Sequence, residues 1–466
     1  MSPVSAFTGL EGLRALRHRN FRLFWSGQLV SLVGTWMQAV AQGWLVLTLT
    51  NDPFMLGVVA AAQFVPVMIF GLFGGIVADS LPKRSTLIAT QTVAMSLAFI
   101  LAVLTATGTV QVWEIVLLAL ALGCTNAIDM PTRQSFVIEM VGREDIGNAV
   151  ALNSAIFNGA RIVGPAVAGL TIGVFDISTA FFINGLSFVA VIASLLAMRS
   201  DELTAVARTA MPRTVHAVFD TLAEGLSYVR RTRIVLLGVS VVGLVSLVGM
   251  NFGVVVPAMA RDVLGSGAEG YGFLMAASGL GSLVAALAVA FLGRPSQRVL
   301  VGGAIVLGIL EIVMALSHSM ALSLVCMFGI GAGGIAMAMT ANTAIQLTVP
   351  DALRGRVMAV YTTVFAGSTP LGGLAFGAIA ALGGVSAAIL IGGLAALAIG
   401  IVATIVACRW GLLGPAPSAL PTTERYQPED RRLAGDVGIV DRAARAGQRE
   451  PQADGIVVGV VRVIDS

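Results

Sequence analysis

Hydrophobic residues in this chain fall into long runs of about 20 residues, separated by short polar stretches. A run of that length crosses the hydrocarbon core of a bilayer as an α-helix. The pattern predicts twelve transmembrane helices, at roughly 22–49, 54–78, 85–106, 112–136, 150–173, 178–198, 234–259, 271–293, 299–317, 320–346, 357–381 and 386–408.

Composition argues against the alternative of a large soluble core. Hydrophobic residues make up 57% of the 466 residues, charged residues make up 11%, and the mean hydropathy is +0.91. A soluble domain carries about 25% charged residues. We therefore predict an all-α membrane protein whose surroundings are the lipid bilayer. The net charge of +3 fits loops that face anionic lipid, not nucleic-acid binding.

Basic residues cluster in alternate loops, which is the pattern that sets the orientation of membrane proteins. With the N-terminus in the cytoplasm, the loops on the opposite side carry one basic residue, Arg261. The cytoplasmic segments then hold Arg14, Arg17, Arg19, Lys83, Arg84, Arg143, the arginines from Arg199 to Arg233, Arg294, Arg298, Arg354, Arg356 and the basic residues of the tail. We predict a multi-pass protein of a bacterial-type inner membrane with both termini cytoplasmic.

The chain carries an internal duplication. A shift of 208 residues places five glycines of the first half on glycines of the second: Gly123 on Gly331, Gly147 on Gly355, Gly159 on Gly367, Gly164 on Gly372 and Gly169 on Gly377. We therefore expect two pseudo-symmetric six-helix bundles with a binding site at their interface. The expected boundaries are a cytoplasmic N-terminal segment at 1–20, bundles at 21–199 and 234–409, a polar linker at 200–233, and a mostly disordered cytoplasmic tail at 410–466.

Several kinds of site are excluded by what the sequence does not contain. Cys124, Cys326 and Cys408 lie inside predicted helices without metal-ligand spacing, and the three histidines form no cluster. The sequence has neither a phosphate-binding Gly-x-x-x-x-Gly-Lys loop nor an HExxH motif. We expect no metal, no cofactor, no ATP-driven pumping and no enzymatic activity.

Two motifs resemble signatures of the major facilitator superfamily of transporters. Gly75-x-x-x-Asp79, followed by Lys83 and Arg84, lies between the second and third predicted helices. Helix 5 carries a run that resembles the superfamily's antiporters, with Gly159, Gly164, Pro165 and Gly169. The segments 19–28 and 350–356 are similar to the branch that contains the enterobactin exporter and macrolide efflux proteins. The resemblance covers about residues 20–410 and implies the major facilitator fold.

The resemblance implies a gating latch at the cytoplasmic ends of the helices. Its expected members are Gly75, Asp79, Lys83 and Arg84, with Arg133 at the end of helix 4 as an available partner. The alternative is that Asp79 is a solvated residue at the membrane surface. The glycines of the helix 5 motif form either a flat face for helix packing or a flexible gate.

Asp129 and Arg161 are ionisable residues at membrane depth, which makes each a functional candidate. Both are candidates for proton coupling. A buried arginine needs a partner, and Asp129 is the acid nearest to Arg161 in predicted depth; carbonyl groups near Pro165 are the other possible partners. A purely structural Asp–Arg pair is the alternative to a proton role. Glu311 is expected at the periphery, near the outer membrane surface; the alternative is that it is a coupling acid.

Helix 1 carries a stripe of polar residues spaced 3, 4, 3 and 4 apart, which places them on one helical face. In a membrane such a face is expected to line a wet cavity. The predicted cavity residues are Gln28, Ser31, Thr35, Gln38 and Gln42, together with Asn126, Asn251, Asn342 and Gln346. Hydrogen bonding between helices explains any one of them, but explains the whole stripe poorly.

These features together predict a secondary active transporter. We expect a proton-coupled exporter of small amphipathic molecules, such as a drug or a siderophore, that works as a monomer by alternating access. Its partners are then a small-molecule substrate and protons. The alternatives are a metabolite importer or uniporter of the same fold, and a non-transporting membrane sensor or scaffold that signals through its tail.

Overall fold

The computed structural model describes residues 11–204, 215–292 and 296–413. For residues 71–80 and 215–222, and at positions 11, 292 and 352, it describes the backbone alone. The predicted tail therefore lies outside the described residues from 414 onward. Only the backbone is described at Gly75 and Asp79, so the latch predicted around the side chain of Asp79 stays a prediction.

Every regular element in the described part of the chain is a helix. The first half contains α1 (Arg19–Thr50), α2 (Pro53–Ser80), α3 (Lys83–Ala106), α4 (Val112–Val174) and α5 (Ile177–Leu196). After α6 (Val215–Arg231), the second half contains α7 (Arg233–Gly249), α8 (Phe252–Ala258), the π-helical turn η4 (Met259–Val263), α9 (Ala268–Leu292), α10 (Gln297–Ala315), α11 (Met320–Thr348), α12 (Asp351–Gly383) and α13 (Val385–Arg409).

Eleven helical segments in the described residues are long and apolar enough to cross a membrane. One of them, α4, has 63 residues and breaks at Gly142, whose φ of 71° suits a residue without a side chain. Each side of the break is roughly 30 residues long, which is enough for one crossing. The twelve predicted crossings are therefore present, but the predicted loop at 137–149 is helical apart from this break.

The seventh crossing runs from Arg233 to Val263 and is also interrupted. Its helix stops at Gly249, and the next helix starts at Phe252. The side-chain amide of Asn251 donates to the carbonyl oxygen of Leu247 at 2.8 Å. A helical backbone N–H would otherwise make that bond, so the asparagine stabilises the interruption.

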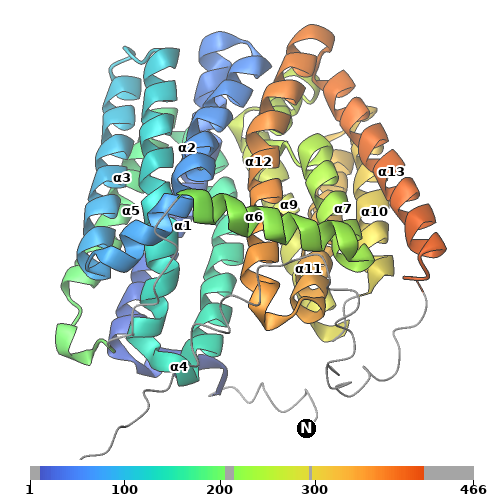
Figure 1. Cartoon of the computed structure of the whole chain (residues 1–466). Helices are drawn as coiled ribbons and strands as arrows, with labels where there is room; N and C mark the ends of the chain where they lie inside the picture. Colours follow the sequence, from blue (N-terminus) through green and yellow to red (C-terminus); the bar gives the residue numbers. More distant parts are fainter. Residues whose placement is uncertain (1–10, 205–214, 293–295, 414–466) are drawn as a thin grey trace, which may run out of the picture. The chain divides into compact units, whose positions relative to one another are not determined.

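The helices form two halves, α1–α5 and α7–α13, which Figure 1 colours from blue to green and from yellow-green to red. With an even number of crossings, the helix ends at Arg19 and Arg409 lie on one face, called here the terminal face. The loops at Asn51 and Gly384 lie on the opposite face. The helix α6 lies across the bundle and packs against α7 and α12 (Figure 1).

The two halves contact each other closely towards the opposite face. A Cβ atom added to Gly57 of α2 would lie 2.3 Å from the carbonyl oxygen of Gly373 on α12. Arg261 of η4 donates hydrogen bonds of 2.8 Å to the carbonyl oxygen of Leu47 and to the side chain of Asn51. These contacts close the structure at the opposite face, where α1 and α2 meet η4 and α12.

At the terminal face, residues 11–17 form a short 3₁₀ helix, η2 (Glu11–Arg17), that docks on the break in α4. His18 lies 2.8 Å from Asp145, and Arg14 forms an ion pair with the same carboxylate. The side chain of Asn148 binds the backbone of Gly12 and Ala15. Residues 11–17 of the N-terminal segment therefore form a short helix that is held against α4.

Candidate functional site

A cavity of about 740 Å³ lies within the first half of the molecule. Its lining comes from α1, α2, α3, both parts of α4, and α5. The polar lining residues are Gln28, Ser31, Thr35, Gln38, Gln42, Gln63, Gln91, Thr125, Asn126, Asp129, Arg133, Gln134, Asn153, Ser154, Asn158 and Asn184. Most of them are amides, so the cavity offers both hydrogen-bond donors and acceptors.

All five residues of the polar stripe on α1 line this cavity, as does Asn126 of α4. The stripe faces inward because its spacing keeps it on one side of the helix. Two of its members form bonds that fix their positions: Gln38 accepts from the amide of Asn184 on α5, and Thr35 donates to the carbonyl of Ser31 at 2.9 Å.

Apolar side chains complete the wall of the cavity. They are Phe24, Leu32, Ala39, Ala94, Leu122, Met130, Val137, Val150, Ile156, Phe157 and Phe188. The cavity is therefore amphipathic. Its volume falls in the range of about 300–1,000 Å³ that is typical of sites for small organic ligands.

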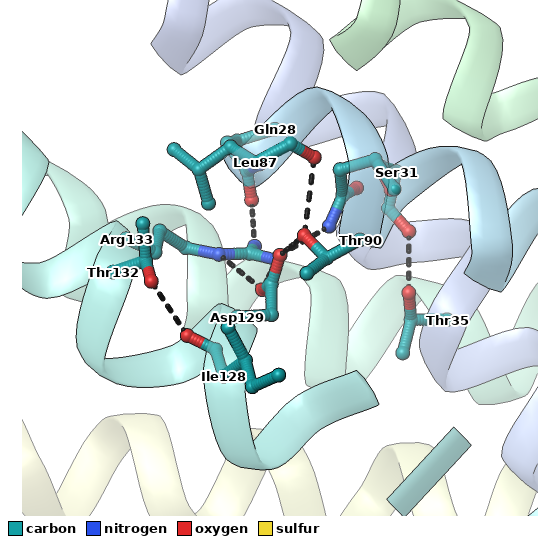
Figure 2. A network of polar contacts seen from close by, with 10 residues as sticks. Gln28, Ser31, Thr35, Leu87, Thr90, Ile128, Asp129, Thr132 and Arg133 are labelled. Carbon is teal, nitrogen blue, oxygen red and sulfur yellow. Dashed lines mark hydrogen bonds and ion pairs between the residues drawn. The ribbon is translucent and has the colours of Figure 1, made fainter. Parts of the chain in front are cut away.

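Asp129 is the centre of the charged network on the cavity wall, and its side chain is 3% exposed. Figure 2 shows its carboxylate between Arg133 on one side and Thr90 on the other. Oδ1 lies 2.7 Å from the hydroxyl of Thr90 and accepts from the amide of Gln91 at 2.8 Å. Oδ2 accepts from Arg133 at 3.0 Å and through a second, shorter contact.

Arg133 connects this network to helix α1. One of its nitrogens donates to the side-chain oxygen of Gln28, the first residue of the polar stripe (Figure 2). The guanidinium is thus shared between the carboxylate of Asp129 and the amide of Gln28. Arg133 is the partner of Asp129 in this conformation. The latch around Asp79, to which the sequence also assigned Arg133, involves a side chain outside the described residues and stays a prediction.

The expected pairing of Arg161 with Asp129 is wrong for this structure. The guanidinium carbon of Arg161 lies 5.8 Å from the centre of the Trp36 ring on α1. Trp36 in turn contacts Phe157 edge to face, with ring centres 5.8 Å apart. In the described residues, Arg161 has no acidic partner and no hydrogen bond to a carbonyl group near Pro165. Its side chain is half-buried and is stabilised by a cation–π contact.

The basic residues that follow Asp79 bind elsewhere in the first half. Lys83 forms an ion pair of 2.6 Å with Glu139 of α4. Arg84 donates to the carbonyl oxygens of Leu195 and Leu196, which belong to the last turn of α5. Lysine and arginine are favourable at helix C-termini because they bind the free carbonyl groups. In this conformation both residues connect α3 to its neighbours.

The motif of the fifth predicted crossing, which the structure places in the second part of α4, lies at contacts between helices. Gly164 packs against Trp36, because an added Cβ atom would lie 2.5 Å from that side chain. Gly169 packs against the start of α9 at Glu269, and the carbonyl oxygen of Pro165 lies 2.4 Å from where a Cβ of Gly272 would stand. No described atom lies within 4 Å of a Cβ added at Gly159. Three of the four motif residues thus form the seam between α4 and its neighbours α1 and α9.

Three predicted cavity residues lie away from the cavity, in the second half. Asn251 is buried at the interruption after α7. The side chains of Asn342 and Gln346 bond to each other on α11. The duplication predicted a binding site at the interface of the two bundles, but the lining of this cavity comes entirely from the first half.

Several lining residues were missed by the sequence analysis, among them Gln63, Gln91, Asn153 and Asn184. The signal was present, since each is a polar residue inside an apolar membrane helix. These residues do not belong to a periodic polar stripe like the one on α1, because α3 and α5 contribute fewer polar positions to the lining.

Together, the membrane-spanning bundle of two halves and the amphipathic cavity within it define a membrane transporter. The family described as "Transmembrane secretion effector" matches residues 11–417, so the chain belongs to that family of the major facilitator superfamily. The resemblance drawn from the Gly75–Arg84 and helix 5 motifs is confirmed, and so is the all-α fold. The protein is a transporter and not an enzyme.

Named relatives are transporters as well. The chain is 25% identical to the staphyloferrin A transporter of Staphylococcus aureus over 361 residues, which are 76% of this chain and 87% of the relative. It is 29% identical to the multidrug efflux pump Tap of Mycobacterium tuberculosis over 392 residues, 82% of this chain and 91% of the pump. The solved structure of the nucleoside transporter NupG superposes with a TM-score of 0.65 at 13% identity, over 84% of this chain and 98% of that one, which shows the shared fold.

Proposed function

We propose that this transporter is a proton-coupled exporter of small amphipathic molecules, such as a drug or a siderophore, in the cell's inner membrane. The observation that carries the proposal is the cavity of about 740 Å³, which is lined by amides together with aromatic and aliphatic side chains. An apolar pocket with a few polar groups suits varied amphipathic solutes better than sugars, which need many matched hydrogen bonds. The names of the efflux and siderophore relatives agree with this class of substrate.

The cavity also indicates what the substrate must offer. The side-chain oxygens of Gln91 and Asn153 are buried and have no donor among the described residues. Both residues line the cavity. A buried acceptor without a donor costs about 1–3 kcal/mol. In this conformation these two oxygens are covered, so a solute in the cavity would meet the other amides of the lining. Their oxygens accept from N–H or O–H groups, so we expect substrates that carry hydrogen-bond donors as well as an apolar body.

Asp129 is the proposed coupling acid, because it lies on the cavity wall and shares its carboxylate with Arg133. A proton that binds Asp129 would displace Arg133, whose guanidinium then remains on Gln28. The proton and the guanidinium of Arg133 thus compete for the same carboxylate. Replacing one by the other changes the charge on the cavity wall that the substrate contacts. Arg161 is not part of this exchange, since it lies on Trp36.

The cycle we propose is alternating access by a monomer with both termini in the cytoplasm. The terminal face is then cytoplasmic, as the clustering of basic residues suggests. This structure is closed at the opposite face, so the cavity in this conformation is the one that a cytoplasmic substrate would enter. The Asp79 latch belongs to the return step, and Asp79→Asn should lower the rate of transport more than the affinity for substrate.

A transport assay in inside-out membrane vesicles tests the proposal. Candidate drugs, dyes and siderophores should accumulate inside the vesicles when a proton gradient is applied, and an ionophore that removes the gradient should stop accumulation. Gln38→Ala should raise the KM for the best substrate. Asn342→Ala removes an amide outside the cavity and serves as the matched control. Accumulation in right-side-out vesicles, but not in inside-out vesicles, would identify an importer instead.

A further inference from the structure

Glu311 of α10 is a buried acid that the proposed transport cycle does not use. It is 4% exposed, and its Oε2 atom has no hydrogen-bond partner in the described part of the chain. The sequence placed it at the periphery near a membrane surface, and this expectation is wrong. Glu311 is the fifth residue from the C-terminal end of α10, about 6 Å along the axis from the end of the helix. Neighbouring helices nevertheless cover its side chain.

The carboxyl group of Glu311 is wedged between α7 and α13. A Cβ atom added to Gly249, the last residue of α7, would lie 3.2 and 3.5 Å from the two carboxyl oxygens. A Cβ atom added to Gly393 of α13 would lie 2.9 Å from the Cβ of Glu311. Glycine at these two positions makes the space in which the acid fits.

No cation faces this acid from the helices that pack on it. Arg233 begins α7 and Arg409 ends α13, each 16 residues from the glycine that contacts Glu311, or roughly 24 Å along the helix. The remaining ionisable or charged side chains on the described parts of α7, α8, α10, α11 and α13 are Arg298, Cys326 and Cys408. None of them forms an ion pair or hydrogen bond with Glu311 in the described residues.

An ionised carboxylate in this place would be strongly unfavourable. A buried charge without a partner costs several kcal/mol. The group also faces the C-terminal end of α7, where the helix dipole is negative and disfavours an anion. A neutral carboxylic acid avoids both costs.

We propose that Glu311 is a proton-binding site, separate from the cavity, which holds its proton in this conformation and releases it when the junction of α7 and α8 rearranges. The only ligand that the proposal requires is a proton. In the described residues there is no group of three metal-ligating side chains to hold a metal ion.

The junction of α7 and α8 connects this acid to the seam between the two halves. The residue after Gly249 begins the interruption, and Asn251 closes it. A Cβ atom added to Gly372 of α12 would lie 2.4 Å from the carbonyl oxygen of Leu247 and 2.5 Å from the side chain of Asn251. The next residue, Gly373, contacts α2 of the first half. A carboxylate that forces the end of α7 to move would therefore disturb the contact that closes the opposite face.

Two spin labels can report on that closure. Thr109 lies in the exposed loop of the first half at the opposite face, and Leu382 lies at the exposed end of α12. The labels would be attached to Thr109→Cys and Leu382→Cys after the native cysteines are replaced, and their separation measured in detergent by pulsed electron paramagnetic resonance. In the labelled protein with the native Glu311, we expect the fraction of molecules with a long label distance to grow severalfold as the pH rises from about 5 to about 9, because Glu311 loses its proton.

Glu311→Gln imitates the permanently protonated acid and should keep the short distance over the whole pH range. Glu114→Gln, which alters an acid in the capping box at the start of α4, is the control and should respond as the native chain does. An infrared measurement gives a second readout: the C=O band of a protonated carboxyl group should be present in the native protein and absent in Glu311→Gln. Neither measurement needs a substrate or a gradient, so the outcome is independent of the exporter proposal.

A native pH response of the label distance in Glu311→Gln would overturn the coupling of this proton to the seam. An unchanged infrared band would overturn the proton site itself. Loss of folding in Glu311→Gln would also count against the proposal, because glutamine has nearly the shape of the neutral acid. A label distance that changes with sodium concentration at constant pH would show that the site binds a metal cation instead of a proton.

Discussion

Asp129 and Glu311 are buried acids in the two halves of one duplicated fold, and their surroundings are opposite. Asp129 has a donor on each side of its carboxylate and an arginine one helical turn away. Among the described residues, Glu311 has an oxygen without a hydrogen-bond partner, two glycines beside it and no cation near it. Donors and a cation compensate the first carboxyl group, and no described residue compensates the second in this way.

The difference extends to the halves themselves. The first half places its polar side chains around a cavity, where water or a substrate can reach the charges. The second half places its acid at an interrupted helix that touches the seam between the halves. In our proposals, a cation is exchanged at the cavity surface of the first half, and a proton is held inside a packed junction of the second half. Each prediction below separates these two descriptions.

The largest expected effect belongs to Asp129→Asn. If Asp129 carries the driving proton, the variant should lose accumulation of substrate against a gradient, while downhill counterflow exchange should continue because it needs no net proton movement. Uptake by inside-out vesicles measures the first property, and exchange of labelled for unlabelled substrate measures the second.

Two results would contradict this expectation. Uphill transport with a normal pH dependence would show that the proton binds another group, and Glu311 would be the next candidate. Loss of exchange together with loss of folded protein would favour a structural role for the pair with Arg133. Glu114→Gln is a suitable control, since it neutralises an acid away from the cavity lining.

Arg133→Ala should reduce stability strongly, because it leaves the carboxylate of Asp129 buried without its cation. Breaking a buried pair in this way costs roughly 3–5 kcal/mol. The double variant Arg133→Ala with Asp129→Asn should recover much of that loss, since the charge is then gone. Thermal unfolding in detergent measures both, and additive losses in the double variant would refute the pairing.

The fold could be predicted from the sequence because its signal is local. Apolar runs of membrane length give the crossings, and loop charges give an expected orientation. The merged helix α4 was not predicted, because the residues around Gly142 are polar and look like a loop. They extend the helix at the membrane surface, where polar side chains are solvated and do not oppose helix formation.

The candidate site was predicted in part, for a physical reason. The stripe on α1 repeats with the helix period, so the sequence indicates one face. Depth along a helix does not indicate which neighbour a side chain faces, and that is why Asp129 was assigned to Arg161. The correct partner was visible at the i, i+4 spacing, which brings side chains together on one helix. Glu311 was misplaced because its burial depends on two glycines of other helices.

Replacing Glu311 with leucine should leave stability unchanged or raise it, in contrast to the same change at Asp129. An apolar side chain of similar size removes a polar group that has no partner, which gains up to about 1–3 kcal/mol. Asp129→Leu removes the partner of Arg133 and should destabilise. Unfolding midpoints in detergent compare the two variants directly, and a marked loss of stability in Glu311→Leu would reveal a partner that this conformation does not contain.

Arg161→Ala should have the smallest effect of the four. The variant loses a cation–π contact with Trp36, worth about 0.5–2 kcal/mol, and leaves no buried acid unpaired. Its effect should add to that of Asp129→Asn within about 0.5 kcal/mol, as expected for residues that share no partner. Arg133→Ala and Asp129→Asn should instead show strong coupling. The two double-variant cycles, measured by thermal unfolding, therefore decide which arginine belongs to Asp129. A large coupling with Arg161 would mean that the acid changes partners between conformations, and the charge on the cavity wall would then itself be part of the switch.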